Sequence, residues 1–128
     1  MGDGNLTEAE VFPRIGEEGF ARIVSGFYRR VREDNVIGPL YPESDWEGAE
    51  KRFRDYLVYR FGGPQRYVEE RGHPRLRMRH GSFPIGEAQR DRWLELMDAA
   101  LDEAEIPGEV AELLRAFFGP VADFMRNQ

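Results

Sequence analysis

The sequence predicts an all-α fold with one domain. Its 128 residues are 41% hydrophobic, a length and composition that fit a single domain with an ordinary core. Several segments repeat apolar residues at the spacing of a helix face, and none sustains the alternation of apolar and polar residues that is typical of a half-buried strand. Because the sequence contains no internal repeats either, we expect a chain of helices around one core.

Two helices are predicted before residue 33. Thr7 and Glu10 have the spacing of a capping box, and Pro13 is expected to end the short helix that begins there. We interpret residues 1–13 as an N-terminal extension. A longer helix is expected over about residues 17–32, and its apolar face consists of Phe20, Ile23, Val24, Phe27, Tyr28 and Val31.

The middle of the chain is predicted to contain one full helix and one very short helix. Ser44 and Glu47 offer a second capping box, and the helix that follows is expected to end at Gly62-Gly63-Pro64. One side of this helix carries Trp46, Ala49, Phe53, Tyr56 and Leu57. Residues 64–72 are predicted to be an irregular connection. A helix of barely two turns is then expected over residues 74–80.

Two longer helices complete the predicted fold. The first covers about residues 86–103, with Trp93, Leu96, Met97 and Ala100 facing inward. The second covers about residues 108–126, and its apolar stripe consists of Val110, Leu113, Leu114, Phe117, Phe118, Val121 and Met125. Gly119-Pro120 is expected to kink or interrupt this last helix.

Charge and cysteine content exclude several classes of protein. Eighteen basic and 24 acidic residues give a net charge of −6, the wrong sign for a protein that neutralises phosphates, so we expect no nucleic-acid partner. Without cysteine there are no disulfides, thiolate metal sites, thiol nucleophiles or cofactors attached through a C-x-x-C-H motif.

The first residues lack the apolar core of a signal peptide, and no segment has the length of a membrane span. We therefore expect a soluble cytoplasmic protein with no membrane contact.

The two histidines are the candidate metal ligands. His73 stands between Gly72 and Pro74 at the expected start of the short helix, where an exposed capping role explains it. His80 shares a face of that helix with Leu76. It is either a structural histidine or a metal ligand whose other ring nitrogen bonds the carbonyl four residues back.

The one basic concentration in this acidic chain lies beside His80 and consists of Arg71, Arg75, Arg77 and Arg79. These arginines form either a solvated face or a clamp for an anionic group. Because a guanidinium pairs well with carboxylates, an anionic cofactor beside His80 would use Arg79 in particular.

Three polar aromatic residues lie at positions where burial is expected. Tyr28 is on an apolar helix face, Trp93 faces inward on another helix, and Tyr41 lies in a turn flanked by prolines. Once buried, each must place its O–H or N–H on a partner. Core packing alone accounts for any one of them, so a shared functional role is a hypothesis at this point.

The most specific motifs lie between residues 62 and 93 and consist of Gly62-Gly63-Pro64, Tyr67, Arg71-Gly72-His73-Pro74-Arg75-Leu76-Arg77-Met78-Arg79-His80 and Arg90-Asp91-Arg92-Trp93. These segments resemble the group II (O-type) truncated haemoglobins. The resemblance extends over about residues 14–126 and includes Phe27-Tyr28, Leu40-Tyr41-Pro42-Glu43 and Phe117-Phe118. Two features depart from the family: Gly16 and Gly19 are separated by two glutamates, and Phe61 replaces a common Trp.

The resemblance implies a truncated globin fold over residues 14–128, in which two helix pairs sandwich haem b, iron protoporphyrin IX. His80 would be the proximal ligand of a five-coordinate iron. Tyr28, Tyr41 and Trp93 would surround the bound gas on the distal side.

Further haem contacts are implied residue by residue. Ala49 occupies the position of the usual distal histidine, and Phe53 lies one turn later. The residues implied to lie near the haem propionates are Arg52, Tyr67 and Arg79. The residues implied to lie against the porphyrin are Leu76 and Met97.

Three distal donors imply that oxygen is retained rather than delivered. Each hydrogen bond to the bound gas contributes about 1 to 2 kcal/mol, so two would slow oxygen loss by roughly a hundredfold.

We expect a protein that binds O₂, CO or NO, and the alternative is an NO dioxygenase or a weak peroxidase. A haem-free helical module that binds another protein is the competing hypothesis. A reductase with a basic docking side would suit the acidic surface, and either a monomer or a homodimer is expected.

Overall fold

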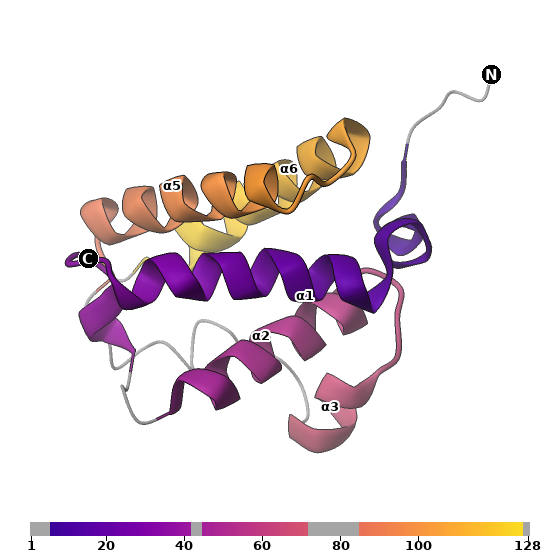
Figure 1. Ribbon diagram of the computed structural model, residues 1–128, viewed down its shortest axis with the longest axis horizontal. Coiled ribbons are helices and arrows are strands. Elements are labelled where there is room, and N and C mark those ends of the chain that lie inside the picture. The colour runs from indigo at the N-terminus through magenta and orange to yellow at the C-terminus, as the bar shows by residue number, and fades with distance from the viewer. Residues whose placement is uncertain (1–5, 42–44, 72–84, 127–128) are drawn as a thin grey trace.

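The computed structural model describes residues 6–41, 45–71 and 85–126. All regular elements in these ranges are helices, so the predicted all-α class is confirmed. The elements, labelled as in Figure 1, are η1 Glu8–Glu10, α1 Val11–Arg32, η2 Gly38–Leu40, α2 Trp46–Arg60, α3 Arg66–Arg71, α5 Glu87–Glu103 and α6 Gly108–Phe124. None of the helices in these ranges is both long and apolar enough to cross a lipid bilayer.

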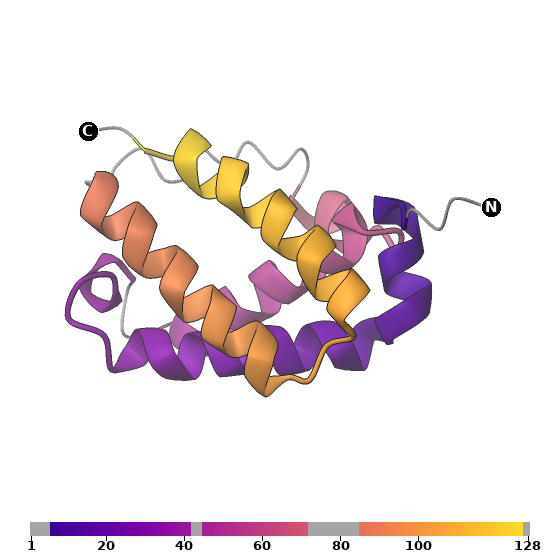
Figure 2. The ribbon, with the colours of Figure 1, turned by 90° about the horizontal axis from the view of Figure 1, so that it is seen from above.

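Two pairs of helices form two layers. Helix α1 packs against α2 on one side and against α5 on the other, while α5 packs against α6 (Figure 1). Seen from above, α5 and α6 run side by side across α1 (Figure 2). The short connection between α5 and α6 makes them antiparallel, as expected for neighbouring helices joined by a few residues. The expected arrangement of two helices over two is therefore confirmed.

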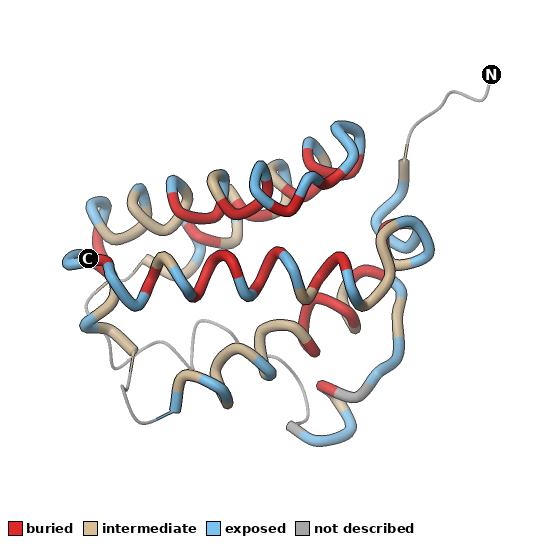
Figure 3. The backbone as a smooth tube through the Cα atoms, in the orientation of Figure 1, coloured by how far each residue is buried: buried red, intermediate tan, exposed pale blue. Residues whose placement is uncertain are grey.

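The core is centred on α1. Its predicted apolar face is almost completely buried, and the side chains with no exposed surface are Phe20, Ile23, Val24, Phe27 and Val31. Figure 3 shows buried residues along α1 and on the parts of α5 and α6 that face it. In α2, by contrast, buried residues begin only at Asp55, and its N-terminal half is partly or fully exposed. Burial is thus concentrated in α1, α5, α6 and the C-terminal half of α2.

The chain continues as a helix past Pro13, where the sequence predicted an end. Helix α1 begins at Val11, so Pro13 lies in the first turn, where backbone N–H groups have no partner within the helix. The break lies at Gly16, whose φ of 66° and ψ of 179° are not helical. The helix predicted over residues 17–32 is confirmed as the second part of α1.

Two other segments differ from the prediction. Residues 64–72 were expected to be irregular, but residues 66–71 form α3, which is too short to display a periodic apolar face. Pro120 does not interrupt α6, which continues to Phe124. Proline removes the hydrogen bond to the carbonyl of Ala116, and water can replace it because Ala116 is exposed. The short helix expected over residues 74–80 lies outside the described residues.

The end of α2 packs closely against the N-terminal segment. The Phe12 backbone N–H donates to the Phe61 carbonyl at 3.0 Å. Gly62 has a φ of 100°, and a Cβ at this position would overlap with the carbonyl oxygen of Ala9. Glycine is therefore required at residue 62 both by its backbone conformation and by the close approach of another backbone segment.

We predict that Gly62→Ala lowers the free energy of unfolding by about 2 kcal/mol, because it combines a left-handed backbone with a steric overlap. The matched control is Gly119→Ala, which places a Cβ in open space within α6. The control should be neutral or slightly stabilising because alanine favours a helix. Urea unfolding of the two variants measures the difference, and equal stabilities would contradict the role of Gly62.

Candidate functional site

Three polar aromatic residues from three segments meet at one place. Tyr28 on α1 is 5% exposed, Tyr41 directly follows η2, and Trp93 lies on α5. The rings of Tyr28 and Tyr41 meet edge to face, with centroids 5.5 Å apart. Phe27, which precedes Tyr28 on α1, packs against Trp93 with centroids 5.0 Å apart. The structure brings together the three residues that the resemblance placed around a bound gas, and their role there stays a prediction.

Hydrogen bonds in this cluster converge on the Tyr41 hydroxyl. Burial raises the pKa of Tyr28 well above its ordinary value, and the charge of Tyr41 and the hydrogen bond to Tyr41 raise it further. Burial also raises the pKa of Tyr41, whereas hydrogen bonds with Trp93 and Tyr28 lower it. An indole N–H can only donate, so Trp93 is the donor in its hydrogen bond with Tyr41 Oη. The hydroxyls of Tyr28 and Tyr41 are bonded to each other, and both phenols are neutral at pH 7.

Phe53 on α2 forms an apolar wall beside this cluster. Its ring centroid lies close to those of Phe27 at 5.8 Å, Tyr28 at 6.1 Å and Trp93 at 6.2 Å. Phe53 is only partly buried, as are Ala49 one turn earlier and Trp93. Met97, one turn after Trp93 on α5, is 1% exposed. Partly exposed apolar surface thus lies directly beside the three polar groups.

The predicted propionate contacts on α2 and α3 lie in different surroundings. Arg52 forms an ion pair with Asp45 at the start of α2, with Nη2 and Oδ2 3.0 Å apart. Its charge opposes part of the rise that burial causes in the pKa of Tyr28. Tyr67 on α3 is 5% exposed, and its ring lies 5.4 Å from Tyr56 and 6.5 Å from Tyr59 between centroids. A guanidinium has more donors than one ion pair uses, so Arg52 can still bind a second carboxylate.

The remaining predicted site residues, His80, Leu76 and Arg79, lie outside the described residues, and so does His73. Within the described part of the chain, no group of three or more acidic or histidine side chains could hold a metal ion. The described residues therefore offer the polar aromatic cluster and the apolar wall, while the predicted metal ligand stays a prediction.

Asp34 is a buried acid that the sequence analysis missed. It lies between α1 and η2, and its side chain is 3% exposed. The backbone N–H groups of Val36 and Ile37 donate to its Oδ2 at 2.9 Å, and Arg92 Nε on α5 donates to its Oδ1 at 2.5 Å. Burial alone would raise the pKa of Asp34, but hydrogen bonds from Ile37, Arg92 and Val36 outweigh it and hold the pKa below its usual range.

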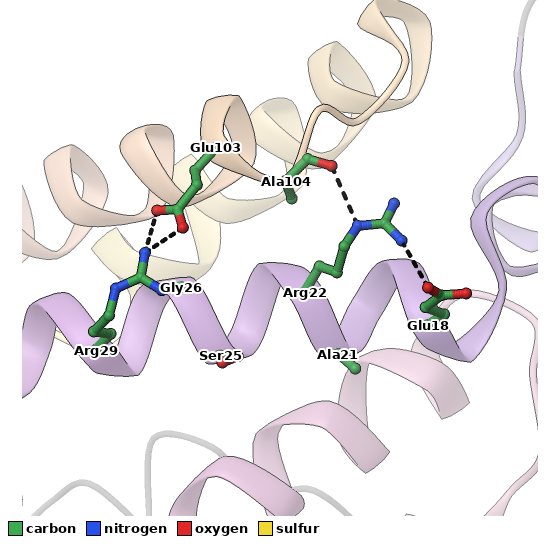
Figure 4. A pocket seen from close by; sticks show the side chains of 8 residues that line it. All are labelled: Glu18, Ala21, Arg22, Ser25, Gly26, Arg29, Glu103 and Ala104. Carbon is green, nitrogen blue, oxygen red and sulfur yellow. Dashed lines mark hydrogen bonds and ion pairs between the residues drawn. The ribbon is translucent and has the colours of Figure 1, made fainter.

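A separate hollow of about 320 Å³ lies on the outer side of the contact between α1 and α5 (Figure 4). It is lined by Glu18, Ala21, Arg22, Ser25, Gly26, Arg29, Glu103 and Ala104. Its charged groups are already paired: Arg29 binds Glu103, and Arg22 Nε donates to the Ala104 carbonyl at 3.4 Å. These contacts hold α1 against α5. None of the residues that line the hollow belongs to the aromatic cluster.

A family model described as bacterial-like globin matches residues 10–127, which is nearly the whole chain. The chain belongs to the bacterial-like globin family. Globins bind haem and small gaseous ligands such as O₂. As a member of this family, the protein binds haem and such ligands too.

Similar proteins place this globin more narrowly. A group 2 truncated haemoglobin of Bacillus subtilis is 38% identical over 117 residues, covering 91% of this chain and 88% of the relative. The haemoglobin of the thermophilic phototrophic bacterium Chloroflexus aurantiacus has a TM-score of 0.89 and 45% identity, covering 92% of this chain and 98% of that chain. The truncated oxygen-avid haemoglobin of Bacillus subtilis has a TM-score of 0.87 and 37% identity, covering 91% and 98%. The predicted membership in the group II truncated haemoglobins is confirmed.

The described residues of the globin fit a haem group. A porphyrin presents a large flat apolar surface, and the partly exposed side chains of Ala49, Phe53 and Trp93 offer apolar and aromatic contacts to it. Hydrogen-bond donors stabilise a partly negative bound gas, and the hydroxyls of Tyr28 and Tyr41 and the indole of Trp93 are groups of this kind. The chemistry of these side chains therefore agrees with the family's cofactor.

We predict that Asp34→Asn lowers the free energy of unfolding by about 1 to 2 kcal/mol at pH 7, because the amide has one acceptor oxygen instead of two and no charge, so some of these hydrogen bonds are lost and the others are weakened. The folded pKa of Asp34 is below the unfolded value of about 3.9. Its contribution is therefore present above that value and is lost as the pH falls through the folded pKa.

Urea unfolding of wild type and Asp34→Asn at pH 7 and pH 3.5 measures this contribution. The difference between the two proteins should shrink at the lower pH. Asp98→Asn is the matched control, because Asp98 pairs with Arg115 on the surface with 58% of its side chain exposed. It should change stability by less than about 0.5 kcal/mol. A difference for Asp34→Asn that is equal at both pH values would contradict the assignment.

Proposed function

We propose that this globin binds O₂ at haem b and retains it, with Tyr41 as the principal hydrogen-bond donor to the ligand. The observation that carries the proposal is that the Tyr41 hydroxyl is the shared hydrogen-bond partner of Tyr28 and Trp93. The Trp93 indole can only donate, and a tyrosine hydroxyl both donates and accepts. If Tyr28 is the second donor, the Tyr41 proton is the part of the cluster that is offered to a ligand.

The two supporting donors strengthen the Tyr41 O–H as a donor. Hydrogen bonds into the oxygen draw electron density from it, and such chains reinforce one another where the dielectric constant is low. Burial keeps the pKa of both phenols above the ordinary value, so each retains its proton at pH 7. Tyr28 and Trp93 therefore act mainly by orienting and polarising Tyr41.

Retention follows from the size of these interactions. Haem supplies an iron atom that binds the diatomic gas, and the protein adds hydrogen bonds to the partly negative ligand. One direct bond of about 2 kcal/mol, with about 1 kcal/mol from the support of Tyr28 and Trp93, slows dissociation roughly a hundredfold. The description of the Bacillus subtilis relative as oxygen-avid supports the same behaviour at 37% identity.

The remaining haem contacts are proposed from the family motifs. His80 would hold the haem iron through its imidazole, and Leu76, Met97, Ala49 and Phe53 would contact the porphyrin. Near the propionates we place Arg52, Tyr67 and Arg79. Haem b is the form expected, because a chain without cysteine cannot form the thioether links of a C-x-x-C-H attachment.

We predict that Tyr41→Phe accelerates O₂ dissociation about a hundredfold, because it removes the direct hydrogen bond and also the support that acts through it. Tyr28→Phe and Trp93→Phe each remove one support and should accelerate it by at most about fivefold, which corresponds to the whole of the supporting energy of about 1 kcal/mol. Laser photolysis or stopped-flow replacement of O₂ by CO measures these rates. The control is Tyr59→Phe, which should leave the rate unchanged. Tyr59 lies in the C-terminal half of α2, where its ring packs against Tyr67 of α3.

An unchanged rate in all three variants of the cluster would refute the hydrogen-bonding role. A larger effect for Tyr28→Phe than for Tyr41→Phe would reverse the order of the donors. In that outcome Tyr28 would be the direct donor and Tyr41 the support.

We also predict that His80→Ala abolishes stable haem binding. The variant is supplied with haem and its visible absorption is compared with that of wild type, ferric and then reduced, with and without CO. His73→Ala is the matched control and should keep the wild-type Soret band. A normal haem spectrum in His80→Ala would remove His80 as the ligand.

A further inference from the structure

Asp34 and Arg92 form an ion pair next to the aromatic cluster but outside it. The pair joins the segment after α1 to helix α5, with Arg92 Nε and Asp34 Oδ1 2.5 Å apart. The Asp34 side chain is 3% exposed and that of Arg92 is 43% exposed. An arginine at the protein surface thus reaches a carboxylate that has almost no contact with water.

Asp34 holds the segment that ends in Tyr41. Its carboxylate accepts the N–H groups of Val36 and Ile37, and its own backbone carbonyl accepts the Gly38 N–H at 3.2 Å. The Tyr41 N–H in turn donates to the Gly38 carbonyl at 3.1 Å. Consecutive hydrogen bonds therefore connect the Asp34 carboxylate to the backbone of Tyr41.

Arg92 is connected to Tyr41 through Trp93, the next residue on α5. The Trp93 indole donates to Tyr41 Oη. The contacts close a ring that runs from Asp34 through Gly38 to Tyr41, across to Trp93 and back through Arg92 to Asp34. In such a ring the ion pair fixes the spacing between the two segments that carry the Trp93–Tyr41 hydrogen bond.

The segment between α1 and Tyr41 begins with tight packing against the end of α1. Ile37 is 1% exposed, and a Cβ at Gly38 would lie 2.7 Å from the Val31 carbonyl oxygen, so the segment folds tightly onto the end of α1. Arg92 is itself oriented by Glu95, whose Oε1 accepts from Nη1 at 3.0 Å. The guanidinium is thereby directed toward Asp34 from the surface of α5.

We propose that Asp34 and Arg92 are positioning residues that hold Tyr41 in hydrogen-bonding register with Trp93 and thereby set the rate at which the bound gas is lost. This inference rests on the proposed function of Tyr41 as the ligand donor. Removing the guanidinium leaves a buried carboxylate with only two backbone donors, which favours entry of water and a shift of the segment that carries Tyr41. The Trp93–Tyr41 hydrogen bond would then lengthen or break.

The test compares substitutions at two arginines of the same helix in the haem-loaded full-length protein. Arg92→Gln should accelerate O₂ dissociation about three- to tenfold, and Arg92→Lys, which keeps the charge, should have a smaller effect. The matched control is Arg90→Gln, because Arg90 also lies on α5 and is paired, with Asp91 and Asp123. The control should stay within about twofold of wild type. An equal acceleration by both glutamine variants would overturn the proposal.

A double-mutant cycle separates positioning from general loosening of the fold. In a Tyr41→Phe background, Arg92→Gln should cause no further acceleration, because its effect passes through the Tyr41 hydroxyl. The same acceleration in both backgrounds would overturn the proposal.

A spectroscopic readout does not depend on ligand kinetics. In the diamagnetic CO complex, the indole N–H of Trp93 is followed by ¹H–¹⁵N NMR and assigned through its loss in Trp93→Phe. Its hydrogen exchange should be at least about tenfold faster in Arg92→Gln than in Arg90→Gln. Equal exchange in the two variants would contradict the positioning role.

The outcomes also separate this inference from the function on which it rests. If Tyr41→Phe leaves O₂ dissociation unchanged, the proposed role of Tyr41 fails and the inference fails with it. If Tyr41→Phe accelerates dissociation and Arg92→Gln does not, the role of Tyr41 stands and only the positioning role of the ion pair is overturned.

Discussion

The burial of α1 between α2 and α5 is the constraint on which the rest of the structure depends. Its apolar face contacts both of these helices, so the side chains on that face are held from two sides. Tyr28 lies on this face and is only 5% exposed, so its hydroxyl needs a partner within the protein. A buried hydroxyl without a partner is costly, and the fold meets that cost by bringing Tyr41 from η2 and Trp93 from α5 to the same point. The polar cluster is thus a consequence of where α1 packs.

The long helices could be predicted from the sequence because packing and periodicity agree in them. The face of α1 repeats from Phe20 to Val31 with helical spacing, and those are the side chains with no exposed surface. The capping box at Thr7 and Glu10 is likewise present: the Thr7 backbone N–H donates to the Glu10 carboxylate at 2.8 Å. Features set by tertiary contacts were less accessible. Pro13 ends no helix because it happens to fall in a first turn, and α3 has too few residues to show a period.

The same distinction explains which parts of the candidate site the sequence revealed. Tyr28, Tyr41 and Trp93 could be named because family motifs surround them, although nothing in their spacing shows that Tyr28 and Trp93 share Tyr41 as a hydrogen-bond partner. Asp34 has no motif at all, and only the folded chain shows that Arg92, 58 residues later, reaches it. A signal did exist: an acid directly after a helix, followed by Asn35 and a Gly38-Pro39 turn, is typical of a side chain that caps its own backbone.

The uneven burial of α2 connects stability with function. Its C-terminal half is held by buried apolar side chains, including Leu57 and Val58, whereas its N-terminal half presents Ala49 and Phe53 only partly buried beside the polar cluster. Ion pairs help to hold that half, as between Arg52 and Asp45, but surface pairs of this kind contribute little. A ligand that covers the partly exposed apolar surface therefore adds stability to the native state by mass action. The N-terminal half of α2 buries less apolar surface within the protein than the C-terminal half does. A flat apolar cofactor would therefore stabilise the N-terminal half of the helix most.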